Sequence, residues 1–255
     1  MVFKKPNEGS PAFDPRTAPS GRHTTSIPDP LVNDPARQIV GSIGHREVGV
    51  VNASWLLNHP VEHETYLEKR FIMVALACPV VANIEHQPET IKLFINGKQH
   101  SYTPDFRVTL KNGEVIICEI KAEKFLQKTA EKRDAAQLYY EQKGGHYLTF
   151  TQKQIDHNNR AARAILLMRY GRIQIGAEKA QQCKTLLERE ASGSLRVAAL
   201  LEHGISESVI WHMVATHSLR TQTPLNNSDA EPIQLNQDNE DCYVQFVSWF
   251  GTEVR

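Results

Sequence analysis

The sequence predicts a mixed α/β fold, with a sheet flanked by helices and followed by a smaller, mainly helical unit. Apolar runs between residues 80 and 120 are separated by turn signals at 96–97 and 111–113, which is typical of antiparallel hairpins. A helical pattern over residues 123–143 is stopped by two glycines and followed by a strand-like run at 146–150. The strands on either side of that helix must therefore pair in parallel.

Composition sets wide limits on function. The 255 residues are 40% hydrophobic and 23% charged, which suits a soluble globular chain of one large or two modest domains. The chain has 29 Lys and Arg residues and 29 Asp and Glu residues, so it has no net positive charge that would attract nucleic acid. The four cysteines form no CxxC pair, which argues against a zinc site or a disulfide framework. With no membrane-length apolar run and no signal peptide, we expect a cytoplasmic protein without membrane contact.

Residues 1–45 are expected to form a flexible, proline-rich arm. Seven of the thirteen prolines fall within the first 40 positions, among many Ser, Thr and Asn residues. Basic residues in the arm, such as Lys4 and Arg16, could contact phosphates or a partner, or could belong to a plain tail.

A helix is expected from Pro60 to Cys78, with Pro60 in its first turn and an apolar stripe that includes Phe71. Glu64 and Glu68 lie one turn apart beside that stripe.

The strongest chemical signal is Pro104-Asp105 followed by Glu119-Ile-Lys121 at the end of a run that is otherwise apolar. Charged groups are rarely buried unless they are paired or bind a metal, so this run needs an explanation. Hydrolysis of a phosphodiester requires Mg²⁺ held by carboxylate oxygens and a cation beside the attacking water. Asp105 and Glu119 supply the oxygens and Lys121 the cation, as in the PD-(D/E)xK signature of metal-dependent nucleases.

The register of the hairpin tests whether these groups can converge. A two-residue turn at Asn112-Gly113 would place Asp105 opposite Ile120, on the wrong face. A three-residue loop with Gly113 in the left-handed conformation pairs Leu110 with Glu114 and places Asp105 opposite Glu119. We predict the second register. An ordinary hairpin with a surface Glu-Lys pair is the competing interpretation.

The C-terminal part, residues 173–255, is predicted to be a winged-helix-like domain that follows a nuclease domain over residues 46–172. Its expected elements are a helix over 177–191, a helix through 195–201, a helix after Ser206, and two wing strands at 233–235 and 243–249. Such domains bind DNA or proteins, and few cations beyond Arg220 are exposed here, which slightly favours a protein-binding or mixed role.

Three lysines recur every four residues after the motif: Lys124, Lys128 and Lys132. On a helix they would form one cationic edge beside the site and could bind DNA phosphates. A solvated helix face partly paired with Glu131 explains them equally well.

The combined motifs resemble the TnsA family, the endonuclease subunit of heteromeric bacterial transposases. The resemblance covers roughly residues 50–250 and rests on Tyr66-Leu-Glu68, Pro79-Val, Gln87-Pro88, Tyr102-Thr-Pro-Asp105-Phe and Glu119-Ile-Lys121. It implies a restriction-endonuclease-like sheet with a winged-helix-like C-terminal domain.

The resemblance also implies roles for individual residues. Glu68, Asp105 and Glu119 would bind Mg²⁺, for which Mn²⁺ could substitute, and Lys121 would be the catalytic lysine. Glu64 is the alternative to Glu68, and some family members have Gln at the position of Glu119. The subunit would cut the 5′ strands of double-stranded DNA at transposon ends, beside a TnsB-type transposase subunit and a TnsC-type ATPase regulator.

Two other classes remain open. A stand-alone PD-(D/E)xK restriction or repair nuclease would cut DNA without partners. A non-catalytic scaffold would keep the fold and use its C-terminal domain to hold DNA or protein. The presence of all four site residues argues against the second alternative.

Overall fold

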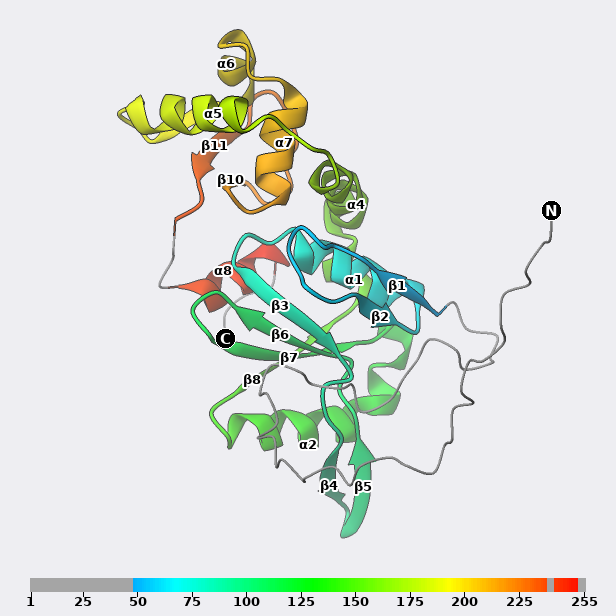
Figure 1. Cartoon of the computed structure of the whole chain (residues 1–255). Coiled ribbons are helices and arrows are strands. Elements are labelled where there is room, and N and C mark those ends of the chain that lie inside the picture. Colours follow the sequence, from blue (N-terminus) through cyan, green and yellow to red (C-terminus); the bar gives the residue numbers. More distant parts are fainter. Residues whose placement is uncertain (1–47, 238–240, 252–255) are drawn as a thin grey trace, which may run out of the picture. The chain divides into compact units, whose positions relative to one another are not determined.

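The structure is a computed structural model that describes residues 48–237 and 241–251 of the chain. The arm expected over residues 1–45 lies outside the described residues. A four-stranded sheet with helices on both faces confirms the mixed α/β class (Figure 1). No helix in the described ranges is long and apolar enough to span a membrane.

The sheet has the strand order β3-β6-β7-β8. Neighbours β3, β6 and β7 pair antiparallel, whereas β8 runs parallel to β7, as predicted from the helical connection between them. Strand β7 has a partner on each side, and five of its six residues are buried. The bounds are Val81–His86 for β3, Phe106–Leu110 for β6, Val115–Ile120 for β7 and His146–Phe150 for β8.

The turn between β6 and β7 has the predicted three-residue form. Gly113 has a φ of 87°, its N–H donates to the carbonyl of Leu110 at 2.9 Å, and the Leu110 N–H donates to Glu114 at 2.8 Å. Phe106 pairs with Cys118, and the same register places Asp105 across from Glu119. The predicted register is confirmed.

The two faces of the sheet have separate cores, because successive side chains of a strand point to opposite faces. Helix α1 (Tyr66–Leu76) covers one face, where the ring centroid of Phe71 lies 5.3 Å from those of both Phe106 and Phe150. Helix α2 (Ala130–Glu141) covers the other face, over a smaller cluster that includes Ile117 and Tyr147.

Helix α1 begins later than the sequence analysis predicted. Val61–His63 forms strand β2, which pairs with β1 (Gly49–Val51), so the helix cannot start at Pro60. Thr65 is the N-cap, and its hydroxyl accepts a hydrogen bond from the Glu68 N–H at 3.2 Å. This start places Glu68 in the first turn and leaves Glu64 before it.

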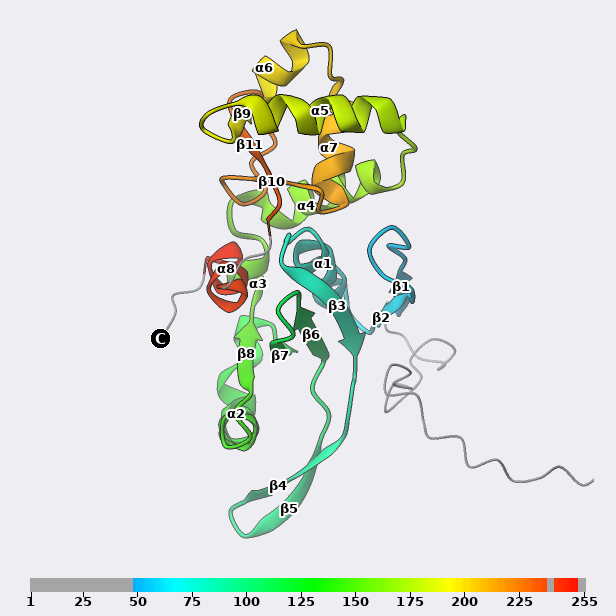
Figure 2. The same cartoon turned by 60° about the vertical axis from the view of Figure 1, so that its left-hand side comes forward.

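Strands β4 (Ile91–Ile95) and β5 (Lys98–Tyr102) form a separate two-stranded hairpin that projects beyond the central sheet (Figures 1 and 2). Asn96 and Gly97 at its tip have φ angles of 52° and 71°, which confirms the predicted turn.

The single helix expected over residues 123–143 is wrong in its first part. Two 3₁₀ turns, η1 (Glu123–Phe125) and η2 (Gln127–Thr129), precede α2. The helical segment that follows β8 is also interrupted. It is divided into α3 (Gln152–Ile155), η3 (His157–Asn159) and α4 (Arg160–Gly171), because Asn158 and Asn159 adopt left-handed conformations.

The C-terminal elements pack beyond α4, which contacts both α1 and α7. The strands of their small sheet follow the order β10-β11-β9. The helix expected at 177–191 and the strand expected at 233–235 are confirmed as α5 and β11. The elements are α5 (Ala177–Arg189), β9 (Ser194–Arg196), α6 (Val197–Glu202), α7 (Glu207–Ala215), β10 (Leu219–Thr221) and β11 (Pro232–Leu235).

The wing strand expected at residues 243–249 is wrong, because this segment is helix α8 (Cys242–Trp249). Cys242, Phe246 and Phe250 recur every four residues and are all buried, which is the spacing of one helix face. The ring of Phe250 lies 5.5 Å from Phe71 and 4.4 Å from Phe150, again between centroids. Helix α8 therefore completes the core between α1 and the central sheet.

Side chains from the C-terminal part also bind carbonyl groups in the last turn of α1, where the helix itself provides no N–H donors for them. The Trp249 Nε1–H donates to the Val74 carbonyl at 3.0 Å, and His217 Nε2 lies 2.9 Å from the Leu76 carbonyl. Burial lowers the pKa of His217 to about 4, and the nearby charge of Lys111 acts in the same direction. His217 is therefore a neutral hydrogen-bond donor at neutral pH.

We predict that His217→Asn destabilises the protein and weakens its response to acid. Asn tolerates the left-handed φ of 58° at this position but is too short to keep the bond to Leu76, which costs about 1–3 kcal/mol. In the wild type the unfolded chain binds a proton at His217 below pH ~6.5 while the folded state does not. Stability therefore falls by up to about 3 kcal/mol between pH ~6.5 and ~4.

Urea unfolding across this pH range measures both effects. The exposed His203 provides the matched control, since His203→Asn should leave the pH dependence unchanged. An unaltered acid response in the His217 variant would contradict the prediction.

Candidate nuclease site

Three of the predicted site residues meet at one end of β6 and β7. Asp105 directly precedes β6, Glu119 is the penultimate residue of β7, and Lys121 follows the strand. The Lys121 Nζ lies 2.7 Å from Glu119 Oε1, and Asp105 Oδ2 accepts the backbone N–H of Ile120 at 2.7 Å. The register of the hairpin thus brings two carboxylates and one ammonium group together.

Glu119 is the most deeply buried of these groups, with only 4% of its surface exposed. Besides Lys121, its carboxylate has a second partner, because the Tyr102 hydroxyl donates to Oε2 at 2.7 Å. The Tyr147 hydroxyl lies 2.8 Å from that of Tyr102 and extends the network to β8. Burial, followed by the charge of Glu119, raises the pKa of Tyr102, so this hydroxyl stays protonated and able to donate.

The closeness of these charges shifts the pKa values of Asp105 and Lys121. Burial, followed by the negative charge of Glu119, raises the pKa of Asp105 well above its ordinary value. Burial alone would lower the pKa of Lys121, but Asp105 and Glu119 outweigh it and raise the pKa overall. Lys121 is therefore a firmly charged ammonium group.

Glu68 lies close enough to act electrostatically on Asp105, but its carboxylate is turned towards the start of its own helix. Its two oxygens accept hydrogen bonds from the Glu64 N–H at 2.6 Å and the Thr65 hydroxyl at 2.9 Å. Burial raises the pKa of Glu68 despite these bonds. The side chain is thus half-buried at the edge of the cluster.

Gln87 joins these parts of the site. Its backbone N–H donates to the Asp105 carbonyl at 2.8 Å, and its side-chain amide donates to Glu64 Oε1 at 3.2 Å. The sequence analysis used Gln87 only as a family marker and gave no role to Tyr147. The Gln-Pro pair was a usable signal, but the position of Tyr147 depends on the pairing of β7 with β8.

The chemistry of the donor set suits Mg²⁺, which prefers carboxylate oxygens. Asp105 and Glu119 lie across from each other, while Glu68 would have to leave its helix cap to join them. In the ranges 48–237 and 241–251, no three His, Cys, Asp or Glu side chains are already arranged to hold a metal ion together. The residues fit the ion by type and proximity, and Mg²⁺ binding stays a prediction.

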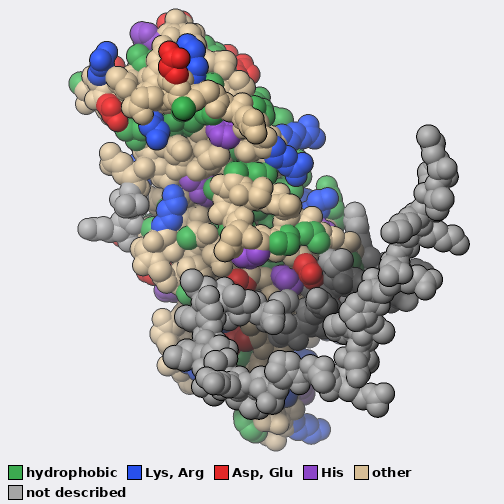
Figure 3. Space-filling model, viewed as in Figure 1, with side chains coloured by type: hydrophobic (Ala, Val, Ile, Leu, Met, Phe, Trp, Pro, Cys, Tyr) green, Lys and Arg blue, Asp and Glu red, His purple; other side chains and the backbone are tan. Residues whose placement is uncertain are grey.

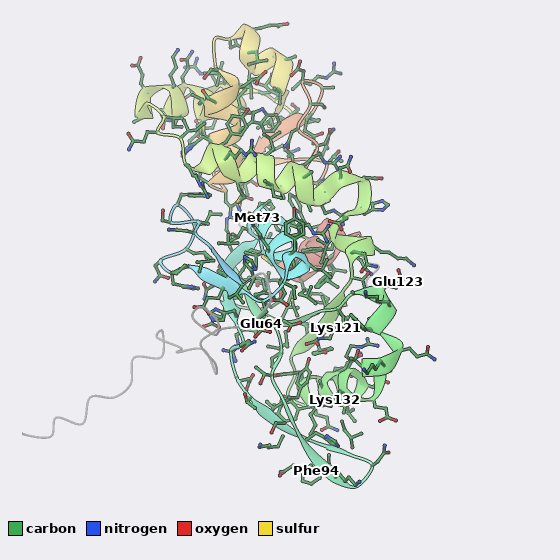
Figure 4. All side chains as sticks on the ribbon, turned by 90° about the vertical axis from the view of Figure 1, so that its right-hand side faces the viewer. Glu64, Met73, Phe94, Lys121, Glu123 and Lys132 are labelled. Atoms are coloured by element: carbon green, nitrogen blue, oxygen red, sulfur yellow. The ribbon has the colours of Figure 1, made fainter. Side chains whose placement is uncertain are left out.

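The three lysines predicted to bind DNA are exposed but do not share one regular helix. Lys124 lies in η1 with its Nζ 5.0 Å from the centroid of the Phe125 ring, Lys128 lies in η2, and Lys132 lies in α2. The four-residue spacing therefore does not by itself place them on one edge, because a 3₁₀ turn holds about three residues. Figure 4 shows Lys132 between Lys121 and the hairpin that carries Phe94.

A mixed sheet flanked by helices, with Asp105 opposite Glu119-Ile-Lys121, is consistent with a nuclease-like fold. Residues 78–152 match the family model of the TnsA-like endonuclease N-terminal domain. The match confirms the resemblance and suggests an endonuclease subunit of a transposase. It includes Asp105, Glu119 and Lys121 but not Glu68 or the C-terminal elements. No curated protein matches the chain.

We predict that Tyr102→Phe destabilises the folded state by about 1–3 kcal/mol, because it removes a donor from the buried Glu119 and leaves the Tyr147 hydroxyl without this partner. Chemical denaturation of the purified protein measures the change. Tyr139→Phe is the matched control, since the Tyr139 hydroxyl bonds to an exposed lysine and should contribute little. Equal effects of the two substitutions would argue against a strong Tyr102–Glu119 bond.

Proposed function

We propose that this protein is the Mg²⁺-dependent DNA endonuclease subunit of a heteromeric transposase, which cuts the 5′ strands at transposon ends. The observation that carries the proposal is the register that sets Asp105 across from Glu119, with Lys121 bound to Glu119, inside a TnsA-like domain. A TnsB-type transposase subunit and a TnsC-type ATPase regulator are the proposed partners.

Asp105 and Glu119 would hold the metal ion, with Glu68 as the third carboxylate. When bound, Mg²⁺ would polarise the phosphate and lower the pKa of the attacking water. Lys121 would orient that water and offset negative charge that develops on the phosphate oxygens. Its raised pKa supports a role as a fixed cation rather than as a neutral base.

The structure supports Glu68 over Glu64 as the helical carboxylate. Glu68 acts directly on the charge of Asp105, whereas Glu64 is engaged by the Gln87 amide. The bonds that cap α1 hold Glu68 away from the other two carboxylates. Release of this cap would therefore accompany metal binding.

The order of the C-terminal elements supports a winged-helix-like domain. Helix α5, strand β9, helices α6 and α7, and strands β10 and β11 follow each other as in such domains, with α8 outside this set. Arg220 Nη2 donates to Gln234 Oε1 across the small sheet, a neutral partner that does not offset its charge. Helix α7 itself carries no Lys or Arg, which favours binding of a transposase partner over DNA binding by this helix.

Two further candidates differ in what the isolated protein would do. A stand-alone restriction or repair nuclease would cut duplex DNA without a partner subunit. A scaffold would bind DNA or partners, and its activity would not depend on the site residues. The family match favours the transposase subunit over both.

We predict that Mn²⁺ binds the wild type and that binding is lost in Asp105→Asn and Glu119→Gln, because each removes a negatively charged ligand while nearly preserving shape. Isothermal titration calorimetry measures this without any cleavage. Glu68→Gln should weaken binding, whereas the matched change Glu64→Gln should not. The reverse result would make Glu64 the helical ligand, and wild-type binding in all four variants would exclude this metal site.

We predict that Lys121→Ala lowers DNA cleavage by about a hundredfold or more without loss of fold. The assay uses a duplex carrying a transposon end, with the TnsB-type partner present and the cut strand mapped. Lys153→Ala is the control, because this exposed lysine pairs with Glu123 near the site. Full activity in the Lys121 variant would favour the scaffold, and efficient cutting by the isolated wild type would favour a stand-alone nuclease.

A further inference from the structure

The β4–β5 hairpin has one face that the protein interior covers and one that it leaves open. Ile91, Leu93 and Tyr102 are buried against α2 and β8, in the smaller of the two cores. Because side chains alternate along a strand, the intervening residues point outwards. The outer face consists of the cross-strand pairs Lys92 with Ser101 and Phe94 with Gln99.

The open face is unusual in both its aromatic and its charged residues. Phe94 is 75% exposed, the most exposed of the large hydrophobic side chains in the described part of the chain. The segment from Ile91 to Tyr102 contains Lys92, Lys98 and His100 but no Asp or Glu, although the whole chain is neutral. The Lys92 ammonium donates to the Ser101 hydroxyl at 2.6 Å, a neutral partner that leaves the charge unbalanced. Figure 3 shows apolar and basic side chains together at the lower end of the molecule, where the hairpin projects.

The hairpin begins at the nuclease site. Tyr102, its last residue, donates to Glu119, and Asp105 lies three residues further along the chain. Counted from the paired residues Ile91 and Tyr102, Phe94 lies three residues along β4 and Lys98 lies four residues along β5. These spacings correspond to about 10–13 Å of strand. The ribbon therefore extends from the carboxylates over a distance of about three to four base pairs of duplex.

We propose that the β4–β5 hairpin enters the major groove of duplex DNA beside the phosphate that is cut, with Lys92, Phe94 and Gln99 of its outer face towards the DNA and the exposed Lys98 beside its Asn96-Gly97 tip. A two-stranded ribbon fits this groove. The lysines contact phosphates, the Gln99 amide can bond to base edges, and Phe94 makes apolar contact with them. Charge complementarity with a polyanion favours DNA over a protein partner. The inference rests on the proposed function and adds the surface that positions the substrate.

The first test measures binding of the full chain to a fluorescein-labelled duplex carrying a transposon end, at several salt concentrations and without divalent metal. The double variant Lys92→Ala/Lys98→Ala should bind roughly tenfold more weakly, and its salt dependence should fall by about two phosphate contacts. Phe94→Ala should weaken binding with an unchanged salt dependence. Lys111→Ala, an exposed lysine in the turn at the opposite end of β6, should bind as the wild type does.

The second test locates the hairpin on the DNA. All four native cysteines are buried, so the variant F94C offers a selectively reactive thiol for a photo-crosslinker. Crosslinks should fall within about three to five base pairs of the mapped cut. Unchanged affinity and salt dependence in the hairpin variants, or crosslinks scattered along the duplex, would overturn the hairpin's role.

The two proposals fail in different ways. If Asp105→Asn abolishes cleavage while the hairpin variants bind and crosslink like the wild type, the hairpin inference is wrong and the nuclease stands. If Asp105→Asn leaves cleavage unchanged but the hairpin variants lose DNA binding, the proposed active site is wrong and the DNA-binding ribbon stands.

Discussion

The three-residue turn between β6 and β7 is the constraint on which the site depends. A side-chain period of two means that one residue more or less in the turn would move Asp105 to the face opposite Glu119. The turn requires a φ of 87° at position 113, which is strained for residues with a Cβ. Gly113 has no Cβ and adopts this conformation freely. Because this register sets Asp105 across from Glu119, the groups that bind the buried Glu119 carboxylate also fix its position relative to Asp105. A backbone conformation in a surface turn thus determines the geometry of a site at the other end of the strands.

The site also has an imbalance of charge. Three carboxylates, those of Asp105, Glu119 and Glu68, share a single cationic partner in the described ranges, which is Lys121. The tyrosine hydroxyls stabilise Glu119 without adding positive charge. Such a cluster repels a phosphate until a cation offsets it, because charges interact strongly in a partly buried environment. The same concentration of negative charge would favour a metal ion beside the phosphate that is to be cut.

The sequence predicted the parts of this structure that depend on local rules. Turn chemistry at residues 111–113 defined the register, and the Gly-Gly stop before 146–150 defined the parallel strand. It could not predict helix α8, since the aromatic residues near its end fit either a wing strand or a helix until their partners are known. Phe71 and Phe150 are those partners, and they lie far away along the chain. Tyr147 was missed for the same reason.

Helix α8 has a consequence for how the chain can be divided. Phe246 and Phe250 complete an aromatic cluster whose other members come from α1 and the central sheet. A fragment cut after α4 would expose Phe150 and much of Phe71 to water, with a loss of roughly 1.5–3 kcal/mol for each large side chain uncovered. During synthesis, this core closes only after Phe250 has left the ribosome. The central sheet, although made early, therefore reaches its final packing only after helix α8 has been made.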